Sequence, residues 1–391
     1  MPDILCGLMI VLSLALPADA VLYRVSPPGS EPAGSDSDFP DIQSAVDASV
    51  DGDIIELAAG IFFGPGNVDI DLQGKAIAIR SIDANPNSSV IDCQGSPGSP
   101  HRAFLAVSGE GPATVLEGIT ILGGHMAGSW PEHAGAAILC RNASSPSIVN
   151  CFFRDNHAGS GGAISCDGLS SPRILYCRFE NNDAVYYGGA IYCHERSSPT
   201  LRGCYFLGNA AGYYGGGLRT VFSSPLILDC TFVDNEAGEG GGGLAFSGSS
   251  APELLQCTIV GNVTGGNSGG IYSYYSEPLI RKTLIAFNSG SAVDVYGDQL
   301  PMLEQCDIFG NLGGDWIDAI APQLGTYGNF SEDPLFCDEH DRDSFTVASN
   351  SPCAPDCNSC EDQIGAWPVG CLNFSAQETS WSELKAMGWS P

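Results

Sequence analysis

A block of 26 to 27 residues recurs along the middle of the chain, and this repeat constrains the fold more than any other feature. In the copy at residues 171–191, a Ser-Pro pair precedes Cys177, Phe179 and Asn182, and the string Gly-Gly-Ala-Ile follows. The cysteine returns at the same interval, at Cys151, Cys177, Cys204, Cys230 and Cys257. The asparagine keeps the same period, at Asn156, Asn182, Asn209, Asn235, Asn262 and Asn288. Such a strict period is typical of a solenoid, in which each repeat packs only on its neighbours.

The residue types within the repeat predict β-strands. Repeats rich in Gly, Pro and β-branched residues argue against a helical solenoid. Stacked coils lie about 4.8 Å apart, so equivalent residues form ladders. The asparagines then predict an amide ladder, the Ile, Phe and Cys positions a continuous core, and the paired glycines tight turns. The sequence therefore predicts an all-β chain, a single-stranded parallel β-helix of about ten coils.

The strings resemble those of the right-handed parallel β-helix superfamily, to which the pectate lyases belong. They are most similar to bacterial repeat proteins of the polymorphic outer-membrane type, whose signature is GG-A-I plus F-x-x-N. Both halves are present, as Gly189-Ala190-Ile191 and as Phe179-Glu180-Asn181-Asn182. The resemblance covers residues 144–311 well, and weaker coils extend back to about Ile54. It implies a right-handed coil and a repeat type, but it implies no particular activity.

The sequence at both ends of the chain predicts segments that lie outside the solenoid. Residues 1–20 resemble a signal peptide, with a 12-residue apolar run and an Ala18-x-Ala20 ending, although no Lys or Arg precedes the run. Residues 21–53 predict a strand and a capping helix at 39–50, with Ile42, Ala45, Val46 and Ser49 on one face. The β-helix is expected at 54–330, and a closing coil with a cysteine-rich tail at 331–391. We therefore expect a secreted or cell-surface protein without a transmembrane segment.

The chain is strongly acidic, with 45 Asp and Glu against 15 Lys and Arg and a formal net charge of −30. This charge argues against nucleic acid as a partner, because phosphate backbones require Lys and Arg. It also disfavours anionic membranes and unassisted binding of acidic polysaccharides. Calcium is the one cofactor that would bridge such a polysaccharide. An acidic loop offers oxygen ligands, although a solvated loop is the favoured interpretation of Asp338, Glu339, Asp341 and Asp343.

Cysteine occurs in two settings. The ladder cysteines, including a second series at Cys140, Cys166 and Cys193, are expected to be buried free thiols. Neighbouring in-register strands present them in a geometry that disulfides fit poorly. The tail holds a separate group, Cys337, Cys353, Cys357, Cys360 and Cys371. Disulfides are the favoured interpretation of this group, with a zinc site or an iron–sulfur motif as alternatives.

Tyrosines recur beside the glycine turns and are the candidate ligand-binding residues. Two pairs precede the turns of consecutive coils, two further residues follow a later turn, and a tryptophan precedes an earlier one: Tyr186, Tyr187, Tyr213, Tyr214, Tyr272, Tyr274 and Trp130. Stacked rings along one edge could form a platform for sugar rings. The alternative is that the rings shield the edge of the solenoid and bind nothing.

No complete catalytic motif is present. Pectate lyases use calcium-binding carboxylates with an arginine, and polygalacturonases use clustered Asp with His, but no Asp-Asp, Gly-His-Gly or Arg-Ile-Lys string occurs. Charged residues fall at unrelated repeat positions, as scattered surface charge does: Asp155, Asp183, Asp229, Asp234, Arg154, Arg178 and Arg202. Histidines also fall at different offsets and match no zinc spacing: His125, His133, His157 and His194.

Two functional hypotheses remain open. The first is an exported, non-catalytic scaffold that binds glycan or another surface component through its stacked coils. The second is a polysaccharide lyase or glycoside hydrolase of the pectate-lyase-like superfamily. Regular coils between Cys140 and Cys257 leave no room for the loops that wall an enzyme cleft, which favours the scaffold. An enzyme site would have to lie in the looser stretches at 95–101, 123–135 and 294–328.

Overall fold

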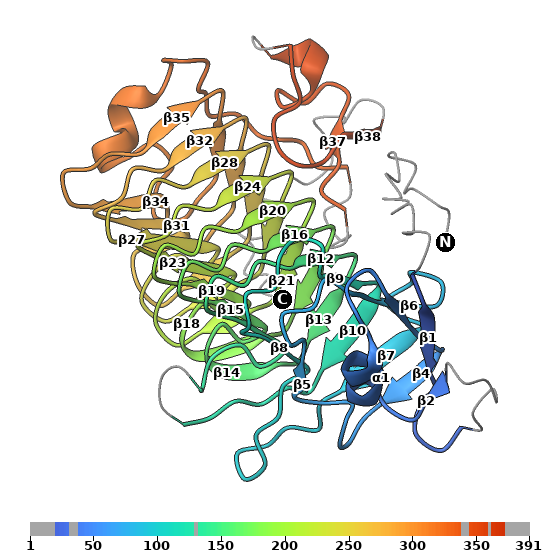
Figure 1. The fold of residues 1–391 in the computed structure, drawn as a ribbon. Helices are drawn as coiled ribbons and strands as arrows, with labels where there is room; N and C mark the ends of the chain where they lie inside the picture. The colour runs from blue at the N-terminus through green and yellow to red at the C-terminus, as the bar shows by residue number, and fades with distance from the viewer. Residues whose placement is uncertain (1–19, 31–37, 129–131, 338–343, 359–360, 372–391) are drawn as a thin grey trace.

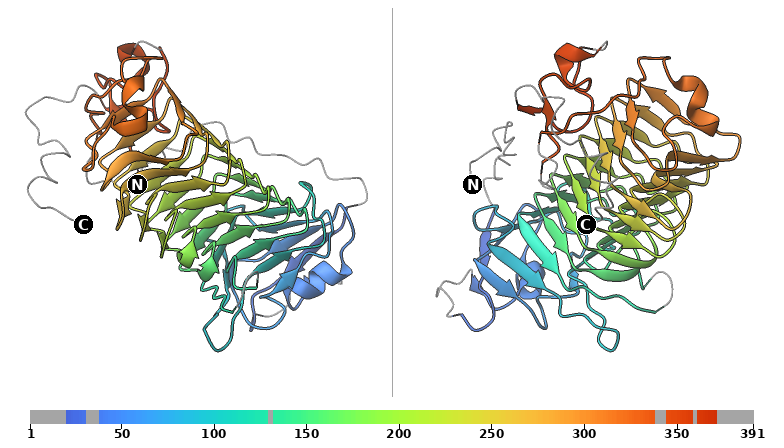
Figure 2. Two further views of the ribbon diagram at one scale, coloured as in Figure 1. Left: turned by 90° about the vertical axis from the view of Figure 1, so that its left-hand side faces the viewer. Right: turned by 180° about the vertical axis from the view of Figure 1, so that it is seen from behind.

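A computed structural model of the chain describes residues 20–30, 38–128, 132–337, 344–358 and 361–371. In it the chain winds into a parallel β-solenoid of about eleven turns (Figures 1 and 2). The predicted fold class is therefore confirmed. Within the described ranges, no helix has the length and hydrophobicity needed to cross a membrane. The expected signal peptide lies, apart from residue 20, outside these ranges.

Four parallel sheets run along the solenoid. The twelve-stranded sheet contains, in spatial order, β2 (Asp38–Phe39), β1 (Leu22–Val25), β3 (Ile54–Leu57), β6 (Ala78–Ser81), β9 (Val115–Glu117), β12 (Ser147–Val149), β16 (Arg173–Leu175), β20 (Thr200–Arg202), β24 (Leu226–Leu228), β28 (Glu253–Leu255), β32 (Leu279–Arg281) and β35 (Met302–Glu304). The ten-stranded sheet contains β36 (Asp307–Phe309), β33 (Leu284–Ala286), β29 (Thr258–Val260), β25 (Thr231–Val233), β21 (Tyr205–Leu207), β17 (Arg178–Glu180), β13 (Phe152–Arg154), β10 (Ile119–Leu122), β7 (Ser89–Asp92) and β4 (Gly60–Phe62).

The other two large sheets lie on either side of the glycine turns. The nine-stranded sheet contains β34 (Ser291–Tyr296), β31 (Ser268–Tyr274), β27 (Leu244–Ser247), β23 (Leu218–Val221), β19 (Ile191–Cys193), β15 (Ile164–Cys166), β11 (Ile138–Cys140), β8 (Phe104–Ala106) and β5 (Ile70–Asp71). The five-stranded sheet contains β14 (His157–Ser160), β18 (Asp183–Tyr187), β22 (Ala210–Ala211), β26 (Glu236–Ala237) and β30 (Val263–Thr264). The remaining elements are α1 (Ile42–Ala48), η1 (Asp318–Gln323), η2 (Pro355–Cys357) and the pair β37 (Val347–Ala348) and β38 (Val369–Cys371).

One coil shows how the repeat turns the chain. It passes through β16, β17, β18 and β19 in order, and each strand joins a different sheet. Single residues with left-handed backbone angles make the bends on either side of β17, Tyr176 at φ 55° and Asn181 at φ 53°. Asn, Asp and Gly tolerate this conformation best. The same residue types therefore recur at these bends in other coils, as in Asn150, Gly203 and Asp229.

The core is a set of stacked side chains, one from each coil. The rings of Phe153, Phe179, Phe206 and Phe232 stack with successive centroid distances of 4.9, 4.7 and 4.4 Å. The ladder cysteines are buried with free thiols, as expected. Cys306 extends this ladder beyond the predicted members, and Thr283 occupies the position between Cys257 and Cys306.

The asparagine ladder is the polar counterpart of this core. Each buried amide Nδ2 donates to the Oδ1 of the next coil, as Asn182 does to Asn209 and Asn209 to Asn235, both at 2.9 Å. The same Oδ1 accepts the backbone N–H of the preceding ladder residue, as in the 3.0 Å bond from Asn182 N to Asn209. The ladder runs one coil further than predicted, because Asn288 donates to Asn311. It satisfies buried backbone and side-chain polar groups together at every bend.

Helix α1 covers the N-terminal end of the core. It is shorter than the helix predicted at 39–50, because Asp41 caps its start through a 2.8 Å bond from Ser44 N and the backbone of Ser49 is extended. Ile42, Ala45 and Val46 are fully buried, as the predicted face required. The helix packs beside β1, β2, β3 and β5. It therefore shields the apolar end of the solenoid from water.

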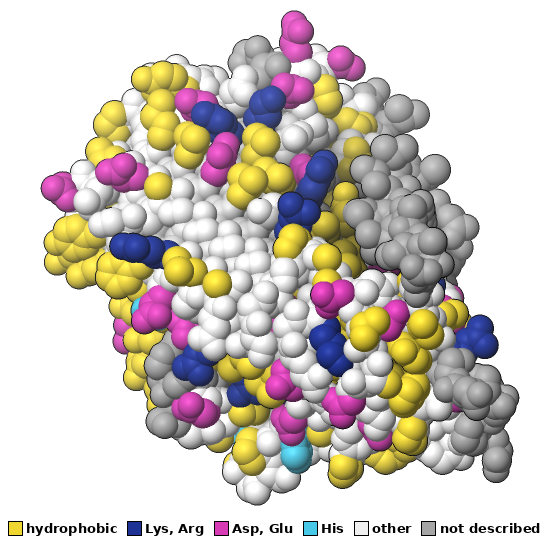
Figure 3. Space-filling view, viewed as in Figure 1, with side chains coloured by type: hydrophobic (Ala, Val, Ile, Leu, Met, Phe, Trp, Pro, Cys, Tyr) yellow, Lys and Arg dark blue, Asp and Glu magenta, His cyan; other side chains and the backbone are white. Residues whose placement is uncertain are grey.

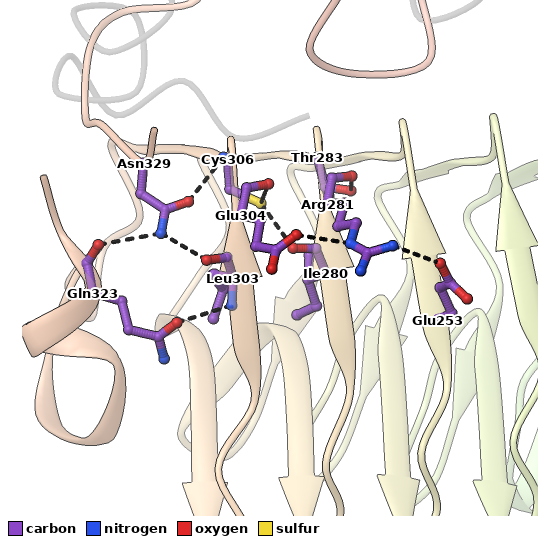
Figure 4. A network of polar contacts seen from close by, with 9 residues as sticks. All are labelled: Glu253, Ile280, Arg281, Thr283, Leu303, Glu304, Cys306, Gln323 and Asn329. Atoms are coloured by element: carbon purple, nitrogen blue, oxygen red, sulfur yellow. Dashed lines mark hydrogen bonds and ion pairs between the residues drawn. The ribbon is translucent and has the colours of Figure 1, made fainter. Parts of the chain in front are cut away.

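At the opposite end of the solenoid, side chains form hydrogen bonds with backbone groups of strand β35 (Figure 4). The Oε1 of Gln323, in η1, accepts the N–H of Leu303 at 2.9 Å, and the Nδ2 of Asn329 donates to the carbonyl of Leu303 at 2.9 Å. On the outer face, Arg281 bonds Glu304 at 2.8 Å and lies 3.3 Å from Glu253, so it links three coils. These contacts replace the hydrogen bonds that a further coil would provide.

The C-terminal segment folds back onto the outer face of the ten-stranded sheet. Ala366 N and Trp367 Nε1 each donate at 2.9 Å, to the hydroxyls of Thr258 and Thr231. A disulfide joins Cys337 to Cys371. Two other cysteines of the group predicted to form disulfides remain thiols. Cys357 is exposed, and the buried thiol of Cys353 donates to Asp307 at 3.2 Å. Cys360 lies outside the described residues.

Asp307 is buried beneath this segment. Burial raises its pKa to about 8, although Glu332 N donates to its carboxylate at 3.1 Å. The folded chain therefore keeps a proton that the unfolded chain releases above its ordinary pKa of about 4.

We predict that Asn209→Ala lowers the free energy of unfolding by about 2–4 kcal/mol, because it leaves several buried donors and acceptors unpaired. Chemical denaturation followed by far-UV circular dichroism measures this loss. The control is Asn181→Gly, since Asn181 is exposed and glycine accepts its positive φ. Equal losses in the two variants would contradict a special role for the ladder.

We predict that Asp307→Asn removes part of the pH dependence of stability. In the wild type, the contribution of Asp307 falls as pH rises from about 4 through 8, because the unfolded chain binds fewer protons over that range. The variant should gain more in melting temperature at pH 8 than at pH 5. Asp298→Asn, at an exposed site, is the control, and an equal gain at both pH values would contradict a buried neutral acid.

Candidate functional site

The tyrosines that precede the glycine turns lie above one another in consecutive coils. Tyr187, at the end of β18, pairs with Tyr214, and their ring centroids are 6.5 Å apart. Tyr186 and Tyr213 stack at 6.0 Å with an interplanar angle of 15°, and they are 41% and 40% exposed. The structure thus brings all four predicted residues into one accessible group.

The later tyrosines join this group through strand β31. Tyr272 stacks on Tyr214 at 5.0 Å, and Tyr274 stacks on Tyr296 of β34 at 5.1 Å. We call this continuous surface the aromatic edge, and its members are Tyr186, Tyr187, Tyr192, Tyr213, Tyr214, Tyr272, Tyr274, Tyr275 and Tyr296. Figure 3 shows hydrophobic side chains gathered at the left margin of the molecule, beside β27, β31 and β34. Trp130, the seventh predicted residue, lies outside the described residues.

Arg219 of β23 lies within the aromatic edge. Its guanidinium carbon is 5.1 Å from the ring centroid of Tyr214 and 6.0 Å from that of Tyr187. The residue is 7% exposed, and its Nη2 donates to Ser247 Oγ at 2.8 Å. Its Nε and Nη1 are buried without a hydrogen-bond partner in the described part of the protein, and burial lowers its pKa. A buried cation with two unused donors is costly, so a role in binding would explain it.

Three phenols of the aromatic edge have a raised pKa. A hydrogen bond with Glu239, together with burial, raises the pKa of Tyr214. Burial is the main cause that raises the pKa of Tyr192 and of Tyr272. The edge presents aromatic rings with hydroxyl groups, a surface that suits ligands with both apolar faces and polar rims.

A second polar group lies beside the aromatic edge, at the ends of β15 and β19. The carboxylate of Asp167 is 3.7 Å from His194 Nδ1 and 3.5 Å from Arg141 Nε. Burial raises the pKa of Asp167, but His194 and Arg141 outweigh it, and the net pKa lies below its usual value. The ring of His194 stacks on Tyr192 at 6.0 Å. Ligand atoms of Asp167, His194 and Glu195 lie within 4.8 Å of one another, so this group has the donors to hold a divalent cation.

Sequence reasoning missed Tyr192 and Arg219, although a signal for them was available. The residue after the Ile or Leu of each glycine signature points outward, because side chains alternate along a strand. Tyr192, Arg219 and Tyr272 occupy this position in their coils, and β-pairing places Tyr192 beside Arg219. Asp167 and His194 lie two residues further along and share the same outward face.

Two of the histidines whose offsets differ are neighbours in space. His125 and His157 stack with ring centroids 4.6 Å apart, and His157 Nδ1 lies 2.6 Å from Asp183. His133 packs against Tyr186 at 5.9 Å. Insertions between 95 and 135 break the repeat spacing there, so the sequence offsets of these histidines did not reveal the contact.

The scattered charged residues form separate local contacts. Arg202 lies 3.3 Å from Asp229 in an exposed pair, and Arg178 lies over the ring of Tyr205 at 5.3 Å. Arg154 lies 5.8 Å from the ring of Phe152. Such contacts are ordinary surface interactions and contribute little individually.

Comparison with known proteins agrees with this architecture. A family model described as a right handed beta helix region matches residues 115–264. Among solved structures, pectate lyase Pel9A is similar at a TM-score of 0.59 and 12% identity, over 89% of this chain and 96% of that chain. A rhamnogalacturonan lyase gives a TM-score of 0.39 and 13% identity, over 75% of this chain and 74% of that chain. No curated protein matches the sequence. The coil register, the family model and the similarity to pectate lyase Pel9A together show that the chain has a right-handed parallel β-helix fold, similar to that of the pectate lyase.

Proposed function

We propose that this protein is an exported, non-catalytic scaffold that binds a polysaccharide along the aromatic edge. The observation that carries the proposal is the unbroken series of ring contacts from Tyr186 to Tyr296. Coils lie about 4.8 Å apart, and four of the five coils that this series crosses carry tyrosines; the coil of Gly240 carries none, and there the ring of Tyr272 stacks on that of Tyr214. An extended polymer laid across the coils would therefore meet rings and hydroxyls along the whole edge.

Arg219 supports the same proposal. Its guanidinium lies 5.1 Å from the ring centroid of Tyr214 and 6.0 Å from that of Tyr187, so its positive charge acts on the binding surface through these rings, while its Nε and Nη1 are themselves buried. The net charge of −30 opposes a polyanion, so a neutral, hydroxyl-rich glycan fits best. Calcium would be needed to bring an acidic glycan to this surface.

Export is supported by the tail. The disulfide between Cys337 and Cys371 is of a kind that persists in oxidising compartments. The fold similarity to pectate lyase Pel9A is consistent with a carbohydrate as ligand, and the coils that carry the edge have no insertions to wall a cleft.

A polysaccharide lyase or glycoside hydrolase is the second candidate function. Asp167, His194 and Arg219 favour it, because a carboxylate, an imidazole and a guanidinium on one outward face are groups that transfer protons or stabilise charge. This candidate predicts turnover, whereas the scaffold predicts binding alone.

We predict that the protein binds at least one polysaccharide and that Tyr186→Ala/Tyr213→Ala weakens binding about tenfold, since two aromatic contacts contribute about 0.5–1.5 kcal/mol each. Calorimetric titration against neutral and acidic polysaccharides, with and without calcium, measures this. The control is Tyr176→Asn, because Tyr176 lies at a bend outside the edge and the equivalent bend residue one coil earlier is Asn150. No binding across the panel contradicts the proposal, and release of reducing ends or unsaturated products in the same samples would favour the enzyme.

We predict that Arg219→Met leaves the free energy of unfolding unchanged or raises it by about 1–2 kcal/mol, because an apolar side chain of similar size avoids the cost of the buried charge. The same variant should lose glycan affinity. Thermal unfolding and the calorimetric titration together test both effects. Destabilisation by about 3 kcal/mol or more would show that Arg219 serves packing, through its contacts with the tyrosine rings.

A further inference from the structure

A cavity of about 400 Å³ opens near the N-terminal end of the solenoid, away from the aromatic edge. Pro65 and Val68 contribute its apolar wall, and Asp69, Gln94, Ser99 and His101 contribute its polar wall. The volume is within the range of small-molecule sites, and an apolar wall with a few convergent polar groups is typical of them. Part of the polar wall comes from 95–101, one of the three stretches in which the coil lengthens.

Three of these side chains form a continuous hydrogen-bonded chain. Ser99 Oγ lies 3.1 Å from His101 Nε2, and His101 Nδ1 lies 2.6 Å from Asp69 Oδ2. Because the carboxylate can only accept, Nδ1 of His101 donates to Asp69, and in the neutral ring Nε2 is then the acceptor for the serine hydroxyl. A serine, a histidine and a carboxylate joined in this order are the arrangement that activates a nucleophilic hydroxyl.

The backbone holds the two partners of the serine in place. Asp69 has a left-handed φ of 54°, and its second oxygen accepts the N–H of Arg102 at 3.0 Å, so the carboxylate is fixed by two bonds. His101 exchanges both backbone hydrogen bonds with His125, at 3.1 and 2.9 Å. The fixed carboxylate of Asp69 and the backbone pairing with His125 therefore hold the imidazole in one orientation, as a catalytic base requires.

The serine lies at the exposed end of the chain of bonds. Ser99 and Ser96 exchange backbone hydrogen bonds of 2.9 and 3.1 Å across a tight turn. This turn brings Ser99 back over the ring of His101, two residues further on. Ser99 is exposed and His101 is 35% exposed, so a substrate can reach the hydroxyl from the cavity.

We propose that Ser99, His101 and Asp69 form an acyl-transfer site that hydrolyses esters of short carboxylic acids. Ser99 Oγ attacks the ester carbonyl carbon while its proton passes to His101 Nε2, and Asp69 stabilises the resulting imidazolium. The tetrahedral intermediate expels the alcohol, which takes that proton, and leaves an acyl-serine. Water then attacks the acyl-serine with His101 as base, which releases the acid and restores the hydroxyl. Gln94 also lines the cavity, and its side-chain amide would donate to the developing oxyanion.

This proposal is independent of glycan binding, because it uses none of the residues of the aromatic edge. The deciding measurement is covalent labelling of the folded, full-length protein by an alkyl fluorophosphonate, with the modified residue identified by peptide mass spectrometry. We expect one labelled serine, Ser99, together with hydrolysis of 4-nitrophenyl acetate. Ser99→Ala should abolish the labelling, and His101→Gln and Asp69→Asn should slow it about 100-fold or more.

The chain offers two matched controls. Ser96→Ala removes the other serine of the turn and should leave labelling unchanged. His157→Gln removes the second histidine that lies 2.6 Å from an aspartate; in the described residues no serine hydroxyl bonds to this ring, so the variant should also label normally. An unlabelled Ser99 in the wild type overturns the proposal, as does labelling that persists at full rate in His101→Gln.

Discussion

The structure depends on the hydrogen bonds that join each coil to the next in a fixed register. Strand pairing supplies most of these bonds, but at the bends the backbone leaves the sheet and would bury unpaired groups. The asparagine ladder resolves this, because each amide serves its own coil and both neighbours, as Asn209 does for Asn182 and Asn235. A slip of one residue would break every rung at once, so register is set cooperatively along the whole solenoid.

Fixed register has a direct consequence for the surface. If inward positions form ladders, outward positions must form them too, and any residue type that recurs there becomes a continuous strip. The aromatic edge arises where two such rows meet, because Tyr187 and Tyr214 precede the glycine turns and Tyr192 and Tyr272 follow them. Arg219 stands in the row of Tyr192 and Tyr272, where the rings of Tyr187 and Tyr214 and the hydroxyl of Ser247 lie close to it. The proposed binding surface thus needs no loops, only substitutions at two positions of the repeat.

The repeat made the fold predictable, and it made the tyrosines predictable only in part. Cysteine and asparagine positions could be aligned by their period, and both ladders are present. The neighbours of the tyrosines, Arg219 and Tyr192, were missed because an outward position carries no constraint on residue type, so its residues vary from coil to coil. His125 and His157 were missed for a different reason. Insertions shift sequence offsets without changing which coils are adjacent, and a period cannot be read across them.

The same insertions explain where nucleophilic chemistry can arise in this molecule. Regular coils place side chains in straight rows, and within a row Asn or His side chains reach the next coil, as Asn182 reaches Asn209 and His157 reaches Asp183. A Ser–His–Asp chain needs a third group at the other ring nitrogen, and at His101 that group comes from backbone that leaves the register. The turn at Ser96–Ser99 does this, since it folds Ser99 onto a histidine only two residues away. The proposed extended recognition therefore lies on the regular coils, and the proposed local chemistry lies where a coil lengthens.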